Sequence, residues 1–197
     1  MAWILSWMIS SLVLPCSFYF TYNLHNMDWT YASNNLVLNN MDWTSNNFAY
    51  VIASLFLSFM VMDLLMGFLY YPERINFMSG YFHHLLYSYI LLDFTACNIP
   101  GILGLLCMLE FPTFVLSIGN LNPRWRNDRL FGFLFFTTRI VYHSFLLFKI
   151  YPWFTGNDMP PQSSRFLVYM AMGLPMHLYW FSRWITSSAV GLRIKVD

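Results

Sequence analysis

The sequence predicts an all-helical membrane protein with six membrane-spanning helices. Its composition is 58% hydrophobic and only 10% charged. Soluble domains carry roughly 25% charged residues, so a soluble fold of this composition could not cover its surface. The apolar residues gather in long stretches that are separated by short polar ones. At 197 residues the chain amounts to a single transmembrane domain, residues 1–197.

The first two predicted spans flank a polar loop. Residues 2–22 come close to the roughly 20 residues that a spanning helix needs, and Pro15 predicts a kink. Residues 23–47 are rich in Asn and repeat Met-Asp-Trp-Thr at 27–30 and 41–44. This pattern predicts an interfacial loop; the alternative is that each Asp caps a short helix whose Trp lies at the interface. The second span covers residues 48–71 and ends before Pro72.

Four further spans complete the predicted bundle. We expect them at 80–94 (extended if 77–79 are helical), 96–118, 130–151 and 166–187. The fourth is interrupted by Pro100 and Pro112, and Pro175 predicts a kink in the sixth. Polar loops at 120–129 and 152–164 separate the later spans.

The loops carry unequal charge, which predicts the orientation in the membrane. Six spans place both termini on one side, together with six basic residues: Arg74, Arg124, Arg126, Arg129, Arg193 and Lys195. The opposite side has two, Lys149 and Arg165, and three aspartates, Asp28, Asp42 and Asp158. The positive-inside rule therefore places both termini in the cytosol or the mitochondrial matrix, which fits the endoplasmic reticulum or the mitochondrial inner membrane. A net charge of +1 argues against a nucleic-acid partner.

Several ionisable residues fall inside predicted spans, where they cost several kcal/mol by rough estimate and are functional candidates. His83 and His84 are adjacent on one helix and point about 100° apart. A neutral imidazole in a dry pocket is a potential nucleophile or general base, although histidines in a bundle are more often structural. Asp63 lies in the middle of the second span and needs a partner, either one of these histidines or Arg139.

The fourth and fifth spans contain a second set of candidates. Glu110 lies beside Pro112, which interrupts the helix and predicts irregular backbone around a polar pocket. Arg139 is the natural counter-ion for Glu110 or Asp63, and the pair could equally be structural. His143 follows Arg139 by one turn and shares its face.

Metal and cofactor sites are not expected. The five histidines show no HxxH or ExxH spacing, which argues against a dinuclear iron site. A haem held by His143 and one of the His83–His84 pair is the alternative. The sequence has no glycine-rich phosphate loop, GxSxG elbow or CxxC motif.

Three segments resemble the TLC domain, the membrane domain shared by TRAM, ceramide synthases and CLN8. They are an aspartate in the helix before Gly-Tyr-Phe-His-His-Leu-Leu (80–86), then Leu-Glu-Phe-Pro-Thr (109–113), then Phe-Phe-Thr-Thr-Arg-Ile-Val (135–141). The similarity covers about residues 48–185. It implies a six-helix membrane barrel whose cavity admits a lipid chain.

In the ceramide synthase branch, the resemblance implies that the His pair carries acyl transfer from acyl-CoA, so His83 or His84 would be the nucleophile. That branch also has an aspartate pair just before the glutamate that aligns with Glu110. Leu103 and Leu106 stand at those positions here. This departure argues against N-acyl transfer and places the chain closer to the other TLC-domain proteins.

Three functions follow as hypotheses. The first is binding or handling of lipid acyl chains by a membrane-lipid protein, with Asp63, Glu110, Arg139 and His143 as polar cavity residues. The second is a non-catalytic accessory subunit of a large membrane complex, such as a mitochondrial respiratory complex or ATP synthase. The third, acyl-CoA-dependent N-acyl transfer, is opposed by Leu103 and Leu106.

Overall fold

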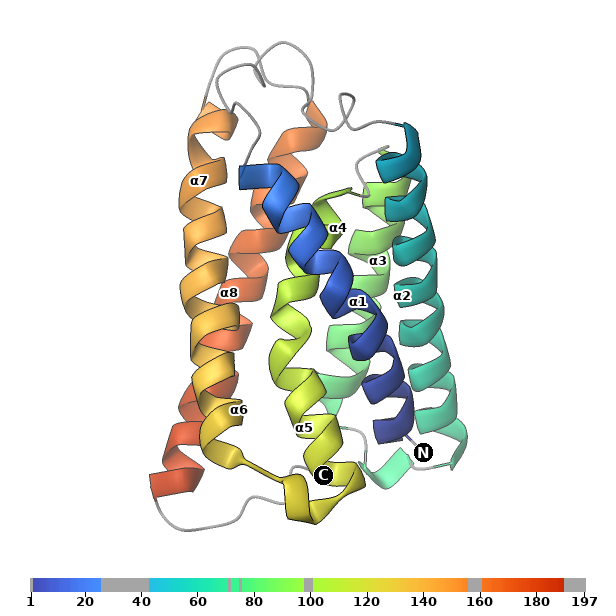
Figure 1. The fold of residues 1–197 in the computed structure, drawn as a ribbon, viewed down its shortest axis with the longest axis vertical. Helices are drawn as coiled ribbons and strands as arrows, with labels where there is room; N and C mark the ends of the chain where they lie inside the picture. Colours follow the sequence, from blue (N-terminus) through green and yellow to red (C-terminus); the bar gives the residue numbers. More distant parts are fainter. Residues whose placement is uncertain are drawn as a thin grey trace.

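The computed structural model describes residues 2–25, 43–70, 72–74, 76–97, 101–155 and 161–189. These residues form a bundle of long helical segments, and no strand occurs among them (Figure 1). The segments in chain order are α1 (Ala2–His25), α2 (Trp43–Tyr70), η3–α3 (Phe77–Phe82 and His83–Ala96), α4–η4–α5 (Gly101–Leu106, Cys107–Glu110 and Phe111–Leu121), α6–η6–α7 (Asp128–Leu134, Phe135–Tyr142 and His143–Thr155) and α8 (Pro161–Ala189). The all-helical prediction is confirmed for these ranges.

Among the described residues, three helical stretches are long and apolar enough to cross a membrane: Asn47–Tyr70, Leu103–Leu121 and Asp128–Lys149. A shorter apolar helix covers Trp3–Phe18. Many of their large apolar side chains face outward. Phe68 is 65% exposed and Phe148 is 76% exposed. In water such a surface would be an aggregation hazard, whereas a lipid environment solvates it.

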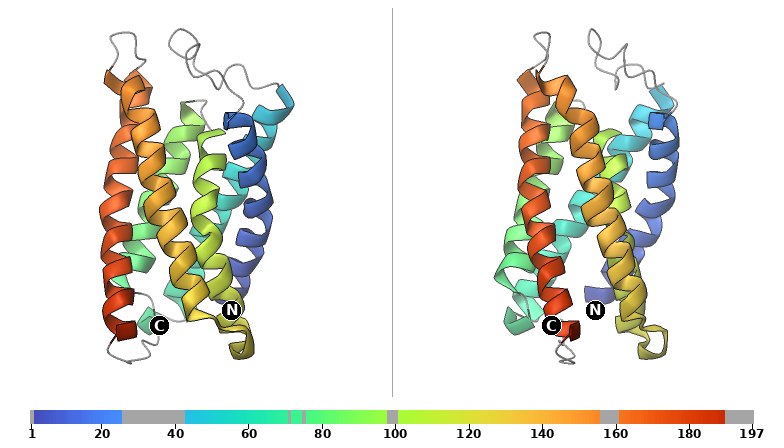
Figure 2. Two further views of the ribbon diagram at one scale, coloured as in Figure 1. Left: turned by 60° about the vertical axis from the view of Figure 1, so that its left-hand side comes forward. Right: turned by 90° about the vertical axis from the view of Figure 1, so that its left-hand side faces the viewer.

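The α4–η4–α5 segment lies in the middle of the bundle (Figure 1). Its upper half packs against α1, α2 and α3, and its lower half packs against α1, α6 and η6. On one side of the bundle α3 packs against α2 and α2 packs against α1. On the other side the η6–α7 segment packs against α8. The start of α1, the turn between α5 and α6, and the end of α8 lie at the same end of the bundle (Figure 2).

Two apolar clusters hold this arrangement together. One joins α1, α2, α3 and α4 around Val13, Phe56, Met60 and Leu91. The other joins α3, α4, α7 and α8 around Phe94, Leu105, Leu146, Phe166 and Met170. The central segment contributes Leu103 to the first cluster and Leu105 to the second. Its polar residue Glu110 is therefore buried as well.

The conditional extension of the third span is confirmed, because residues 77–79 belong to a π-helix that runs into α3. Other predicted boundaries were wrong. The expected loop at 120–129 shrinks to residues 122–127, because α5 continues to Leu121 and α6 begins at Asp128. In the expected loop at 152–164, α7 continues through Pro152 to Thr155 and α8 begins at Pro161. A proline fits that first position, since its missing N–H has no helical partner there.

Pro15 and Pro175 both lie inside continuous helices, α1 and α8. The expected loop at 23–47 is narrower, because α1 reaches His25 and α2 begins at Trp43. The two aspartates predicted to cap short helices, at 28 and 42, lie outside the described residues, as does Pro100.

Candidate functional site

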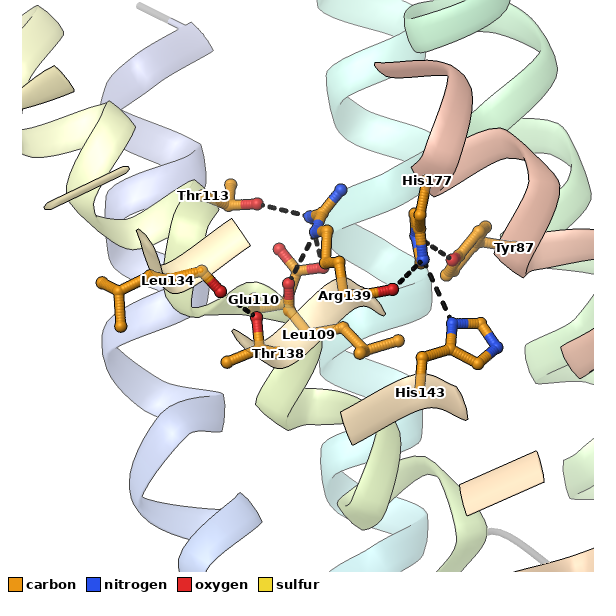
Figure 3. Close-up of polar contacts among 9 residues, drawn as sticks. All are labelled: Tyr87, Leu109, Glu110, Thr113, Leu134, Thr138, Arg139, His143 and His177. Carbon is orange, nitrogen blue, oxygen red and sulfur yellow. Dashed lines mark hydrogen bonds and ion pairs between the residues drawn. The ribbon is translucent and has the colours of Figure 1, made fainter. Parts of the chain in front are cut away.

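A polar core lies at the centre of the bundle, built from Tyr87, Glu110, Thr113, Arg139, His143 and His177 (Figure 3). These residues come from four different segments: α3, the η4–α5 junction, η6–α7 and α8. Glu110, Arg139, His143 and His177 are all buried. A buried ionisable group is tolerated only when it is paired or hydrogen-bonded, so the contacts of each one decide what it can do.

Two of the three guanidinium nitrogens of Arg139 contact the central segment. Its Nε donates to the carbonyl of Leu109 at 2.8 Å, and its Nη2 donates to Thr113 Oγ1 at 2.8 Å. Glu110 Oε1 lies 3.5 Å from the same Nη2. The expected Glu110–Arg139 pair therefore forms, but the shorter bonds go to neutral acceptors. Asp63, the other expected partner, lies against His84.

The backbone explains why the Leu109 carbonyl is available. Residues Cys107–Glu110 form a 3-10 turn, in which a carbonyl bonds to the N–H three residues later. For Leu109 that residue is Pro112, which has no N–H. The sequence prediction of irregular backbone beside Glu110 is confirmed, and Arg139 takes the free carbonyl.

The two buried histidines form a continuous hydrogen-bond chain. His143 Nε2 lies 3.0 Å from the carbonyl of Met170, so this nitrogen carries the proton and donates. His177 Nδ1 lies 3.1 Å from the carbonyl of Arg139, so it also carries a proton. The same Nδ1 is 3.1 Å from His143 Nδ1, which accepts from it. Tyr87 donates its hydroxyl to His177 Nε2 at 3.5 Å. With both imidazoles neutral, the Nδ1–H of His177 is shared between the Arg139 carbonyl and His143 Nδ1, and each of these hydrogen bonds has one donor and one acceptor.

Gly173 permits this close approach of α8. A Cβ at that position would lie 3.1 Å from His143 Cε1, tighter than ordinary van der Waals contact. Helix α8 therefore packs close enough for the Met170 carbonyl to reach the His143 ring. His177, four residues further on, reaches the same ring.

The predicted His pair lies at the start of α3, beside the polar core, which it contacts through Tyr87. His84 Nδ1 is 3.4 Å from Asp63 Oδ2, so the expected contact between the second and third segments forms. His83 is buried among aromatic rings, with centroid distances of 4.3 Å to Tyr87, 5.3 Å to Trp180 and 5.4 Å to His84. Among the described residues His83 Nδ1 has no hydrogen-bond partner.

The His83–His84 pair and His143 each come directly after a π-helix. The π-helix Phe77–Phe82 ends immediately before His83, and the π-helix Phe135–Tyr142 contains Arg139 and ends before His143. Such wider turns occur often at functional sites, because they re-aim side chains relative to a regular helix. The five candidates Asp63, His83, His84, Arg139 and His143 therefore all lie on, directly after, or against these two segments.

A third cluster, which we call the end cluster, was missed by the sequence analysis. Arg165 Nη1 donates to Asp93 Oδ1 at 2.9 Å, and Tyr169 donates its hydroxyl to Asp93 Oδ2 at 2.8 Å. Cys97 Sγ lies 3.9 Å from Asp93 Oδ1. Asp93 interrupts an apolar stretch of the third predicted span, and that signal could have identified it.

A narrow cavity lies between the polar core and the end cluster. Its volume is about 30 Å³, room for roughly two water molecules. The lining is apolar apart from Tyr87, Glu110, His143 and Tyr169. The remaining lining residues are Phe56, Leu86, Ile90, Leu91, Phe94, Leu103, Leu106, Cys107, Leu109, Phe166, Met170 and Gly173.

In the described part of the chain, no group of three or more His, Cys, Asp or Glu side chains is arranged to hold a metal ion. The bis-histidine haem considered from the sequence stays untested. His143 uses both ring nitrogens in the polar core, so an iron ligand at that residue would have to break a hydrogen bond.

No protein-family model, curated protein or solved structure matches the chain.

Proposed function

We propose that this chain is a six-span membrane protein of the TLC class that binds the acyl chain of a membrane lipid inside its bundle. The observation that carries the proposal is the narrow cavity between α3 and α8. Its lining is apolar on nearly every side, and its polar wall consists of groups that already have partners. Such a wall gives a hydrocarbon chain an apolar surface without leaving a charge unpaired against it.

The seam between α3 and α8 supplies the route into this cavity. Large side chains cover it, with Phe94 against Phe166 at 5.6 Å and His83 against Trp180 at 5.3 Å between ring centroids. The cavity lies directly behind Phe94 and Phe166. A volume of about 30 Å³ is far too small for a long chain, so binding requires these side chains to part. The stretch of the seam around Phe94 and Phe166 is apolar and costs little to open, since hydrocarbon replaces hydrocarbon. Polar contacts, Asp93 with Arg165 and Tyr87 with His177, join the two helices on either side of it.

Leu103 and Leu106 add a second argument. Both line the cavity, and they stand where the ceramide synthases carry their aspartate pair. The wall that would hold two carboxylates is therefore apolar here. This favours chain binding over N-acyl transfer, and it supports placement among the TLC-domain proteins that are not synthases.

One observation favours an enzymatic alternative. His83 is buried, surrounded by aromatic rings and has an Nδ1 without a hydrogen-bond partner among the described residues. A neutral imidazole of this kind could take an acyl group or a proton. In that case His83 is the reacting residue and His84, held beside Asp63, positions it.

The alternative of an accessory subunit is favoured by the polar core. Arg139, His143 and His177 are tied to one another or to the backbone, and this locks four segments together without leaving a free reactive group there. In that role the protein would stay in a large complex in its own membrane. Its basic end would face the cytosol or the matrix in either case.

Native mass spectrometry of the protein extracted from its own membrane in mild detergent tests these readings. A particle near 23.4 kDa, or a small multiple of it, that retains lipid supports the proposal. A particle of much larger mass with fixed protein partners and no lipid overturns it in favour of the subunit.

A matched pair of variants makes the test specific to the cavity. Leu106→Phe fills the cavity, whereas Leu92→Phe adds the same ring on the exposed face of α3. We expect only the first to lose bound lipid. Leu106→Ala, which widens the cavity, should retain lipid and guards against a loss caused by misfolding. Equal retention by all three variants would contradict the proposal.

A further inference from the structure

The end cluster lies near the end of α3 and the start of α8. Asp93 is in the last turn of α3, which ends at Ala96, and Arg165 is in the second turn of α8, which begins at Pro161. Asp93 lies ten residues after His83, about 15 Å further along the helix. The cluster is therefore at the opposite end of the α3–α8 seam from the His pair, where a spanning helix meets the interface.

The cluster contains one anion and one cation with very different exposure. The side chain of Asp93 is 13% exposed, whereas that of Arg165 is 56% exposed. Asp93 holds the pKa of the Arg165 guanidinium above its ordinary value, through the hydrogen bond and charge attraction between them. Arg165 is thus the exposed member of the pair, while the carboxylate has a second partner in the Tyr169 hydroxyl.

Aromatic rings stand beside the carboxylate. Tyr89 and Tyr169 meet edge to face with centroids 6.2 Å apart, and Tyr89 is 59% exposed. Rings next to an anion attract a cationic group, because the ring face is electron-rich. The Asp93 half of the cluster is therefore built to receive a positive charge.

The cluster also adjoins the cavity. Tyr169 contributes its hydroxyl to Asp93 and its side chain to the cavity lining. Phe94 and Phe166, which follow Asp93 and Arg165 in sequence, line the same cavity. A molecule with an apolar tail in the cavity would thus have its polar end at this cluster.

We infer that the end cluster is a binding site for the zwitterionic headgroup of a phospholipid whose acyl chain enters the cavity. The lipid's ammonium group takes the place of the Arg165 guanidinium at Asp93, between Tyr89 and Tyr169. Arg165 then turns to the phosphate, which it binds with two parallel N–H bonds. Each charge of the protein keeps a partner of opposite sign throughout the exchange. This inference rests on the proposed chain-binding function.

An anionic or uncharged headgroup fits the site less well. Phosphatidylglycerol would supply a partner for Arg165 but leave Asp93, which is mostly buried, without a cation. Diacylglycerol would supply neither charge. An unpaired buried carboxylate is the costlier outcome, so discrimination should depend mainly on Asp93.

The test offers the purified protein an equal mixture of dioleoyl phosphatidylcholine, phosphatidylethanolamine, phosphatidylglycerol and diacylglycerol. Native mass spectrometry then identifies the lipid that stays bound. We expect one or both zwitterionic lipids to exceed phosphatidylglycerol roughly tenfold, the effect of one charged hydrogen bond. Retention of the choline lipid would assign the ammonium mainly to the tyrosine rings. Retention of the ethanolamine lipid would assign it to hydrogen bonds with Asp93.

Variants connect the preference to the cluster. Asp93→Asn keeps the shape and removes the charge, and it should abolish the preference while total bound lipid remains. Arg165→Gln should weaken it, and Lys149→Gln, which removes another exposed cation, should not.

The outcomes separate the two proposals. Lipid retained without headgroup preference, or with a preference unchanged in Asp93→Asn, overturns the headgroup site and leaves the cavity proposal standing. No retained lipid of any kind overturns both.

Discussion

The polar core and the His pair are both made of ionisable residues inside the bundle, yet their hydrogen bonding differs. In the polar core, Arg139, His143 and His177 have donors and acceptors matched to one another or to carbonyls. In the His pair, His83 has a ring nitrogen without a partner in the described part of the chain. Groups with every bond made rigidify a fold. A buried polar atom left without one calls for a separate explanation, of which a functional role is one.

This comparison assigns stability to the polar core and ligand contact to the His pair. If it is correct, substitutions in the core should lower stability strongly, and substitutions in the His pair should lower it little. Three predictions test this difference, from the largest expected effect to the smallest.

The largest effect should come from Arg139→Met. The change leaves Glu110 buried without its counter-ion and the Leu109 carbonyl without its donor. Removing one member of a buried pair costs about 3–5 kcal/mol. Thermal unfolding in detergent should show a midpoint lower by about 2–4 °C for each kcal/mol lost.

Two further variants sharpen this result. Arg129→Met removes an exposed arginine from the same segment and should leave the midpoint nearly unchanged. Adding Glu110→Gln to Arg139→Met removes the unpaired charge and should recover part of the loss. If Arg139→Met and Arg129→Met unfold alike, the polar core does not stabilise the fold.

An intermediate effect is expected from His177→Phe. Phenylalanine fills the space but accepts no bond from Tyr87 and donates none to His143 or the Arg139 carbonyl. A buried polar group left unsatisfied costs roughly 1–3 kcal/mol. His177→Gln, which keeps a donor and an acceptor, should lose less in the same unfolding measurement. Equal losses in the two variants would show that packing, and not hydrogen bonding, is what His177 supplies.

The sequence allowed some of these pairs to be predicted and not others. Glu110 with Arg139 and Asp63 with His84 were foreseen as candidates because few ionisable residues occur in the spans and each needs a partner. The break at Pro112 was foreseen because proline lacks an N–H. These inferences need only the composition of each span.

The remaining contacts depend on which helices are neighbours. His177 joins the core because α8 packs against η6, and nothing in the spacing of its residues indicates that. Asp93 pairs with Arg165 across 72 positions of sequence for the same reason. Helix ends were also poorly predicted, since Pro152 and Pro161 were interpreted as loop residues although both lie in helices.

The smallest stability effect should come from the His pair, where the comparison with the core is most easily broken. His84→Gln and Asp63→Asn alter a contact of 3.4 Å between side chains that are 12% and 20% exposed. At 3.4 Å this contact amounts to at most one weak hydrogen bond, worth roughly 0.5–1.5 kcal/mol, so the unfolding midpoint should shift by no more than a few degrees. His83→Phe preserves the aromatic packing and removes both ring nitrogens, of which Nδ1 has no hydrogen-bond partner in the described chain, so it should be close to neutral. A gain in stability there, together with altered lipid retention in native mass spectrometry, would mean that the imidazole is kept for a ligand. A loss as large as that of His177→Phe would instead make His83 a structural residue, and the contrast between the two regions would no longer hold.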